Sequence, residues 1–167
     1  MKKLIVYSLL LALFMSCSKY DPGVADNINL VEKYIEAVEA RDYETMELLL
    51  AEDYQGYGPS HSDSTNRADA LATWKYNIGN LYQDIKYSRS RNIAVEIPDG
   101  PNKGQWVSNW AELQIMYQDG RGPVIIWANT TYQIEHGKIS KSYTVYNEAD
   151  VLRQLGYVFI NLNDNQQ

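Results

Sequence analysis

The side chains that could carry acid–base chemistry are few and lie in two short segments. Asp63 stands close to His61 in a segment rich in Ser, Gly and Pro, and Asp150 stands three residues after Asn147. A carboxylate or an imidazole can take a proton from a bound substrate, whereas an amide can only hydrogen-bond to it. Each acid also has a plainer explanation, because Asp150 would place negative charge in the first turn of a closing helix and Asp63 would belong to an exposed polar loop.

A larger set of neutral side chains could line a binding site. The aromatic residues comprise 14 Tyr, 4 Trp and 2 Phe, so most rings carry a hydroxyl group. A mostly apolar cavity with a few donors and acceptors is typical of small-molecule sites, although each of these residues taken singly could pack as ordinary core. The predicted ligand-binding residues are Tyr34, Tyr54, Tyr57, Trp74, Asn109, Thr130, Tyr132, Tyr143 and Asn147.

Other chemistries are not indicated by the sequence. No cluster of His, Cys and acidic residues has the spacing of a metal site, and no glycine-rich loop leads from a strand into a helix, so we predict neither a metal nor a nucleotide cofactor. The formal net charge of −6 argues against nucleic acid as a partner. Arg89 and Arg91 alternate onto one face of an extended segment, where they could meet an anionic ligand or pair with acidic residues of the surface.

Residues 1–16 are predicted to be a signal peptide. Two lysines precede the apolar segment 4–15, which as a helix would cover about 18 Å and so falls short of the ~30 Å hydrocarbon core. Cys17, the only cysteine, follows Ser16, and this arrangement resembles the lipobox of bacterial lipoproteins, in which the cysteine carries lipid. We therefore expect residues 17–26 to be a lipidated tether and residues 27–167 a domain anchored to a lipid membrane of the bacterial cell envelope, on its periplasmic or outer-membrane side. The alternative is secretion without lipidation of Cys17.

Hydrophobic spacing predicts helices first and strands later. Apolar residues recur with a helical period over 27–40, from Asp42 to Leu50, and from Asn66 to Leu81. A brief strand is expected within 53–64. Beyond Asp84 the period changes to two, which predicts four extended segments at 85–97, 105–118, 123–135 and 138–147. Three N-terminal helices packed on a four-stranded antiparallel sheet, with one extra short strand, make an α+β fold.

The turn at His136–Gly137 predicts which side chains share a face. With these as the two turn residues, Thr130 would pair with Tyr143, and Tyr143 and Asn147 would face inward with Asn109. The outer face would then carry Trp106, Trp110, Glu112, Trp127 and Tyr146. So much aromatic surface indicates a partner, and we predict a homodimer through this face; alternatively, residues 155–162 fold back over it.

The end of the chain carries the most specific pattern. Gly137–Ile139 and Tyr143 are followed by Asn-Glu-Ala-Asp-Val-Leu-Arg-Gln-Leu-Gly at 147–156. With the order of elements, this ending resembles the SnoaL-like branch of the nuclear transport factor 2-like superfamily over residues 27–157. The resemblance implies a cone-shaped fold, in which a curved sheet wraps a long helix and leaves a pocket at the open end, commonly in a dimer packed sheet to sheet.

The resemblance also implies a chemistry that this chain does not fully match. Enzymes of the family mostly remove a proton beside a carbonyl or dehydrate a substrate, with an Asp or His as base. The carboxylate usually lies seven residues before the Gln of Gln-Leu-Gly, which here is Asn147, and the histidine that many relatives place after the short strand is missing from 54–59, with His61 coming later.

We therefore predict a binding module for a small, largely neutral organic ligand. The alternative is an isomerase, a polyketide cyclase-like enzyme or a dehydratase with a relocated base, Asp150 or Asp63, and with Tyr57 or Tyr143 as hydrogen-bond donor. The prediction of a binding module depends on Asn147 facing into an uncharged cavity. An outward-facing Asn147, or a buried Asp or His at the base of the cone, would favour the enzyme.

Overall fold

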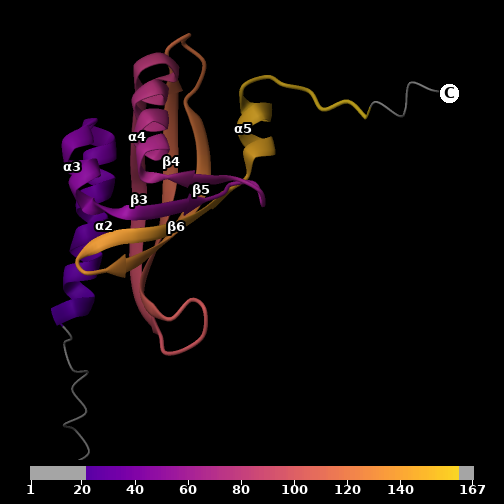
Figure 1. Ribbon diagram of the computed structural model, residues 1–167. Coiled ribbons are helices and arrows are strands. Elements are labelled where there is room, and N and C mark those ends of the chain that lie inside the picture. The colour runs from indigo at the N-terminus through magenta and orange to yellow at the C-terminus, as the bar shows by residue number, and fades with distance from the viewer. Residues whose placement is uncertain (1–21, 162–167) are drawn as a thin grey trace, which may run out of the picture.

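The computed structural model describes residues 22–161, and within them it confirms the α+β class. Two short strands lie between the second and third helices, the four long strands follow, and a short helix ends the described chain; all six strands form one sheet (Figure 1). In chain order the elements are α2 (Pro22–Ala40), α3 (Tyr43–Leu49), β1 (Leu50–Tyr57), β2 (Ser64–Asn66), α4 (Arg67–Tyr76), the π-helical turn η1 (Asn77–Leu81), β3 (Tyr82–Ile97), β4 (Gly104–Tyr117), β5 (Val124–Glu135), β6 (Lys138–Tyr146) and α5 (Glu148–Gln154).

The apolar stripe of α2 faces the sheet. Val31, Tyr34 and Val38 recur at steps of three and four residues and are all buried, as the amphipathic spacing predicts. The helix already runs from Pro22, whereas the sequence predicted its start at Asn27. Part of the segment that was predicted to be a tether is therefore helical.

Two helix starts that were predicted from capping residues are confirmed. The Asp42 carboxylate accepts a hydrogen bond from the Thr45 amide at 3.0 Å, and the Asn66 side chain accepts one from the Asp69 amide at 3.0 Å. These bonds satisfy N–H groups that have no partner within the first turn of a helix. They determine where α3 and α4 begin, and α4 carries Trp74 toward the interior.

The sheet is mixed, which corrects the prediction of an antiparallel sheet. Its strand order is β2-β1-β6-β5-β4-β3; β1 runs parallel to β6, and the other neighbours are antiparallel. The order of strands along the chain predicts the meander from β3 to β6, but it does not reveal that β1 adds beside the last strand. The sheet is strongly bent, so that β1 and β6 cross in front of the long strands β3–β5 (Figure 1).

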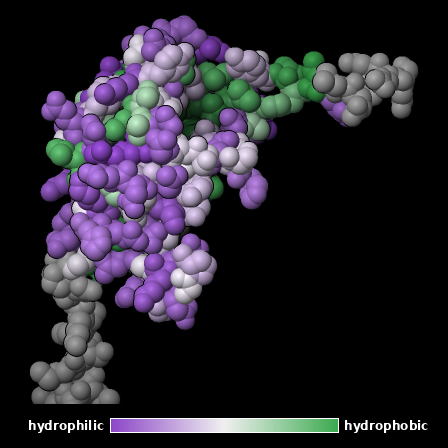
Figure 2. All heavy atoms as spheres, in the orientation of Figure 1, coloured by the Kyte–Doolittle hydropathy of each residue, from purple (hydrophilic) through white to green (hydrophobic). Residues whose placement is uncertain are grey.

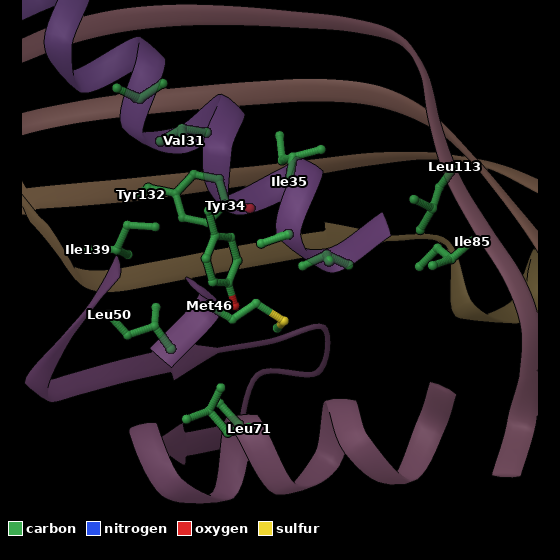
Figure 3. Packing of buried hydrophobic residues seen from close by; sticks show 14 of the residues in the cluster. Val31, Tyr34, Ile35, Met46, Leu50, Leu71, Ile85, Leu113, Tyr132 and Ile139 are labelled. Atoms are coloured by element: carbon green, nitrogen blue, oxygen red, sulfur yellow. The ribbon is translucent and has the colours of Figure 1, made fainter. Parts of the chain in front are cut away.

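The core lies between α2 and the concave face of the sheet. Figure 3 shows Tyr34 of α2 beside Tyr132 of β5, with Leu50 and Ile139 next to them. The two tyrosine rings meet edge to face, with their centroids 6.0 Å apart. Because these tyrosines are both core residues and hydroxyl carriers, the hydrophobic core itself supplies polar atoms to the interior.

A one-residue bulge in β6 changes which of its side chains face inward. Ile134 pairs with Ile139, as the predicted turn requires, but Gln133 then pairs with Lys141, which leaves Ser140 as an extra residue. Side chains alternate between the faces of a strand, so one extra residue moves every later side chain of β6 to the opposite face.

The predicted orientation of the end of β6 is therefore wrong. Thr130 pairs with Thr144 rather than with Tyr143. Tyr143 lies on the outer face, whereas Thr144 and Tyr146 face the interior. A bulge of one residue leaves no clear sign in the sequence, because Ser140 and the residues around it fit either face.

The outer face of the sheet carries a partly exposed apolar surface, which we call the outer patch and define as Trp110, Ile125, Trp127, Tyr143 and Val145. Trp127 is 59% exposed and Trp110 is 43% exposed. The cross-strand pairs place Trp110 and Trp127 on the face opposite to the core. These two residues were predicted to lie there, and the structure confirms their position.

Two other residues predicted for this surface are not available on it. Trp106 is only 3% exposed, because its ring stacks with Tyr143 and its indole N–H donates to the Asn102 carbonyl oxygen at 2.8 Å. Tyr146 lies on the inner face, as a consequence of the bulge. The outer patch is thus smaller than predicted and lies nearer to the end of β6.

The C-terminal segment does not cover the outer patch. The side chains of residues 157–160 are between 53% and 82% exposed. Figure 2 shows hydrophobic residues continuing from α5 into this segment, which extends away from the body of the protein. The alternative that residues 155–162 fold back over the sheet is therefore wrong for the part of the segment that the structure describes.

The predicted signal peptide, Cys17 and the first part of the tether lie outside the described residues, so membrane anchoring stays a prediction. Within residues 22–161, no helix has the length and apolar character needed to cross a membrane.

The homodimer also stays a prediction, and it can be tested by sedimentation. We expect a dimer at micromolar concentration and a monomer for the double variant Trp110→Glu/Trp127→Glu, because two charges would be buried unpaired in the interface. Tyr76→Glu, which alters an exposed aromatic residue on α4, is the matched control and should remain dimeric. A wild-type chain that sediments as a monomer would rule out the dimer.

Candidate functional site

A cavity of about 830 Å³ lies between the helices and the concave face of the sheet. This volume is within the range of small-molecule sites, roughly 300–1,000 Å³. The residues that line it come from α2, α4, all six strands and α5. Aromatic and aliphatic side chains form most of the wall, and the polar members are mostly hydroxyl groups.

Six of the nine predicted ligand-binding residues line this cavity with their side chains on its side of the fold. They are Tyr34, Tyr54, Trp74, Asn109, Thr130 and Tyr132. The sequence argument missed Tyr82, Tyr87, Tyr117, Ser142, Thr144 and Tyr146, which also line it. The alternation of β3 could have identified Tyr87, whereas Ser142, Thr144 and Tyr146 face inward only because of the bulge at Ser140.

Two predicted residues, near the ends of β1 and β6, stack on each other at the rim of the cavity or outside it. Tyr143 lies on the outer face, and Tyr57 borders the cavity but stacks its ring on that of Tyr143 at a centroid distance of 4.9 Å. The parallel pairing of Tyr57 with Tyr143 places both rings on one face. The Tyr143 hydroxyl is therefore not placed to act as the donor that the enzyme alternative needed, whereas Tyr57 still borders the cavity.

Asn147 does not face the cavity, which corrects the prediction on which the binding interpretation depended. It is exposed and caps α5, where its side-chain oxygen accepts a hydrogen bond from the Asp150 amide at 3.1 Å. The physical reason is that β6 ends at Tyr146, so Asn147 belongs to the start of the helix rather than to the strand.

The predicted acid–base candidates separate into one at the cavity and two away from it. Asp63 borders the cavity, whereas Asp150 and His61 do not. Asp150 lies in the first turn of α5 and accepts a hydrogen bond from Gln154 at 3.0 Å, with Arg153 3.6 Å away. Asp150 is thus a negative charge in the first turn of a helix, as its plainer explanation predicted.

The β1–β2 loop brings Asp63 to the cavity because its backbone lies directly against β6. A Cβ atom at Gly58 would overlap the carbonyl oxygen of Thr144, and Gly58 has φ +97°, so glycine permits this close approach. The loop is closed by the Ser60 amide, which donates to the Asp63 carboxylate at 3.2 Å. One oxygen of Asp63 is therefore held in place at the mouth of the cavity.

The arginines considered for anion binding lie elsewhere. Arg89 forms an ion pair with Glu112 at 3.2 Å, and Arg91 pairs with the outer-face residue Trp110 across β3 and β4. Neither borders the main cavity. Glu112, which was predicted to be an interface residue, is thus already partnered by Arg89 and by Ser88, whose hydroxyl lies 3.1 Å from its carboxylate.

Asn109 is the polar group most firmly oriented in the wall. Its amide nitrogen donates to Ser90 Oγ at 2.7 Å and to Asn92 Oδ1 at 2.9 Å, and the Asn92 amide nitrogen donates to Glu32 at 3.0 Å. A carboxylate can only accept, so Glu32 determines the orientation of Asn92 and, through it, that of Asn109. No hydrogen bond reaches Asn109 Oδ1 from the described residues, which leaves this oxygen as an acceptor in the cavity wall.

The tyrosines of the cavity are neutral at physiological pH. Burial raises the pKa of Tyr82 to about 12, and burial also raises the pKa of Tyr34, Tyr87 and Tyr132 above the ordinary value of 10.0. Glu39 and, to a smaller extent, Tyr82 also raise the pKa of Tyr87. The wall therefore offers uncharged hydroxyls rather than phenolates.

Several of these hydroxyls are satisfied within the wall. Tyr54 Oη and Ser142 Oγ are 2.7 Å apart, and Thr130 Oγ1 and Thr144 Oγ1 are 3.1 Å apart. Each pair forms a hydrogen bond in which one hydroxyl donates to the other. Such pairs keep buried polar atoms partnered when no ligand is bound.

Helix α5 closes the cavity through an interaction that resembles strand pairing. Val151, Leu152 and Leu155 border the cavity, and the Gln154 amide forms two hydrogen bonds with the backbone of Ile125. Gln154 Oε1 accepts from the Ile125 amide, and Gln154 Nε2 donates to its carbonyl oxygen, both at 2.9 Å. The side chain occupies the place of a neighbouring strand where β6 has ended, which gives a physical role to the Gln of the Gln-Leu-Gly pattern.

Similarity to solved structures decides the fold. The chain has the nuclear transport factor 2-like fold. It matches IdmH of Streptomyces antibioticus, whose assignment as a polyketide cyclase is provisional, with a TM-score of 0.61, 18% identity and coverage of 77% of this chain and 97% of IdmH. No family model and no curated protein sequence matches the chain.

Two further structures illustrate how varied this fold is. An LEH-like epoxide hydrolase of M. tuberculosis matches with a TM-score of 0.58 and 15% identity, over 80% of this chain and 92% of the hydrolase. A nuclear transport factor 2-like protein of unknown function from Burkholderia pseudomallei matches with a TM-score of 0.60 and 13% identity, over 79% and 98%. The predicted cone is therefore confirmed, and at these identities the likeness concerns the fold alone.

The buried tyrosines predict how the stability of this nuclear transport factor 2-like chain depends on pH. A raised pKa means that, above pH 10, the unfolded chain loses protons that the folded chain keeps, so the free energy of unfolding falls as pH rises from 10 through about 12 and beyond. Urea unfolding at a series of pH values, followed by circular dichroism, measures this fall.

Matched variants identify the groups responsible. Tyr34→Phe should lessen the fall in stability because one buried hydroxyl no longer titrates, whereas Tyr76→Phe, at an exposed position, should leave it unchanged. If the wild-type tyrosines all ionise near pH 10 in a chain that stays folded, the cavity hydroxyls are not shielded from water as described.

Proposed function

We propose that the cavity binds a small, mostly apolar organic ligand and that the chain acts as a binding module. The observation that carries this proposal is the chemistry of the wall. It combines a volume of about 830 Å³ with neutral tyrosine and threonine hydroxyls and one oriented amide. A largely apolar surface with a few positioned polar groups is what small-molecule recognition requires.

This support differs from the sequence argument, which rested on Asn147. That residue faces outward, and by that criterion alone the enzyme alternative would be favoured. The second criterion, whether a buried Asp or His lies at the base of the cone, favours the binding module instead. Among the residues of the described chain that line the cavity, no histidine occurs, and the acidic members Asp63, Asp69 and Glu148 are all exposed rather than buried at its base.

A neutral, environment-sensitive dye such as Nile red provides a direct test. We expect the dye to bind the wild-type chain, and Ala128→Trp to weaken binding by about tenfold or more, roughly 1.4 kcal/mol, because the new ring fills the cavity. Fluorescence titration measures the affinity, and circular dichroism confirms that the variant is folded.

The adjacent residue supplies the control, since it faces the opposite side of β5. Trp127→Gln removes a ring of the outer patch and should leave dye binding unchanged. Binding that survives Ala128→Trp and disappears in Trp127→Gln would place the dye on the outer face and overturn the proposal.

Catalysis by a relocated base is the second candidate function, and one observation favours it. Asp63 borders the cavity and, with Glu148, lies close enough to Tyr146 to raise the pKa of its hydroxyl, although burial contributes most to that shift. A carboxylate beside a neutral hydroxyl could serve as base and hydrogen-bond donor for proton abstraction next to a carbonyl. Structural neighbours whose names suggest polyketide cyclases and ketosteroid isomerases fit this alternative at the level of the fold.

Hydrogen–deuterium exchange at the α-carbons of 2-tetralone separates the two functions. The binding proposal expects the same exchange rate with and without the protein. An acceleration that Asp63→Asn lowers about 100-fold or more, and that Asp53→Asn leaves intact, would establish catalysis instead. Asp53 is the matched control because it is an exposed aspartate of β1 that does not border the cavity.

A further inference from the structure

The charged residues that border the cavity are all of one sign. Asp63 comes from the β1–β2 loop, Asp69 from the first turn of α4 and Glu148 from the first turn of α5. No Lys, Arg or His occurs among the described residues that border the cavity. Three separate elements thus bring negative charge to one opening, and within residues 22–161 no positive side chain lines it.

Asp63 and Asp69 accept hydrogen bonds from uncharged groups, the Ser60 amide and the Asn66 side chain, but no positive side chain of residues 22–161 forms an ion pair with any of the three acids. Glu148 and Asp63 lie close enough to Tyr146 to raise the pKa of its hydroxyl, together with Tyr117 and after the larger effect of burial. A ligand that enters the cavity passes through this field.

The three carboxylates are too far apart to suit a metal ion. No group of three or more His, Cys, Asp or Glu residues in the described chain is placed to hold one. A metal ion needs several ligands within about 2–2.6 Å, whereas an organic cation spreads its charge over a larger volume and can be attracted by dispersed carboxylates. The aromatic wall, which includes Trp74 and Tyr34, also suits a positive group through cation–π contacts.

A second, independent observation concerns the deep wall, away from the three acids. Asn109 is only 2% exposed and uses both of its amide hydrogens on Ser90 and Asn92. Its Oδ1 atom has no partner in the described chain and can only accept a hydrogen bond. A complementary ligand would therefore carry a positive group near the mouth and an N–H or O–H donor that reaches Asn109 Oδ1.

We propose that the ligand is a small organic cation, such as an amine on an apolar ring system, whose positive group is attracted by Asp63 and Glu148 at the mouth. This inference rests on the proposed binding function and specifies its ligand class. It excludes carboxylates and phosphates of similar size, since no positive side chain among the described residues would receive them. The remaining acid, Asp69, adds to the field but is already engaged by the Asn66 amide at 2.8 Å.

The test uses three probes with one ring system and different charge: 1-naphthylmethylamine, 1-naphthylmethanol and 1-naphthoate. Isothermal titration calorimetry at low salt should give the order amine, alcohol, acid, with the amine binding about fivefold or more tighter than the alcohol. Raising the salt concentration should reduce that ratio, because exposed charges are screened.

Matched double variants assign the preference to particular residues. Asp63→Asn/Glu148→Gln should reduce the affinity for the amine to that for the alcohol while leaving the affinity for the alcohol unchanged. Glu52→Gln/Asp53→Asn, which removes the same charge from exposed positions on β1, should leave the preference in place.

The possible results separate this inference from the function on which it rests. Equal binding of the three probes, or a preference for the acid, would overturn the cation proposal alone, provided that Ala128→Trp still blocks binding. Absence of binding for all three probes, together with absence of Nile red binding, would overturn the proposed function as well.

Discussion

The single extra residue at Ser140 determines how the last strand contributes to this protein. Without it, Tyr143 would face the interior and Thr144 and Tyr146 would face the solvent. With it, three hydroxyl-bearing residues, Ser142, Thr144 and Tyr146, enter the cavity wall, and Tyr143 moves outward to stack with Tyr57 and Trp106. The same backbone irregularity therefore adds polarity to the cavity and aromatic surface to the opposite face.

Gln154 completes the hydrogen bonding of β5 at the point where its neighbour β6 has ended. Where β6 ends, the backbone of Ile125 would have open hydrogen-bonding groups, and the Gln154 amide satisfies both of them. This places α5 against β5, so that Val151, Leu152 and Leu155 can close the cavity. The cavity thus has a wall made by the sheet and a cover that is attached to the sheet by one side chain.

Much of the fold follows from local patterns, and the parts that do not have identifiable physical reasons. The stripe of α2, the caps at Asp42 and Asn66, and the inward face of β4 and β5 obey simple periodicity, so the positions of Asn109 and Thr130 could be predicted. The parallel addition of β1 to β6 is a contact between distant segments and leaves no local signal.

The orientations of side chains at the end of β6 and the start of α5 were predicted wrongly, for a different physical reason. A strict alternation carried past Ser140 misplaces Tyr143, and treating Asn147 as a strand residue overlooks that Asn is a preferred helix cap. The resemblance to known enzymes drew attention to Asn147 as a substitute for a carboxylate. In the structure, that position has a structural task that an aspartate could perform equally well.

The mutual pairing of wall hydroxyls affects how selectively the cavity could bind a molecule. Tyr54 with Ser142, and Thr130 with Thr144, already satisfy one another, so an incoming molecule does not have to match them atom by atom. The shape of the cavity and the few polar groups without a hydrogen-bond partner in the wall would then decide which molecule fits. If the cavity binds a ligand as proposed, changing one or two of its unpaired side chains would alter which molecule it accepts, while the paired hydroxyls and the scaffold stay the same.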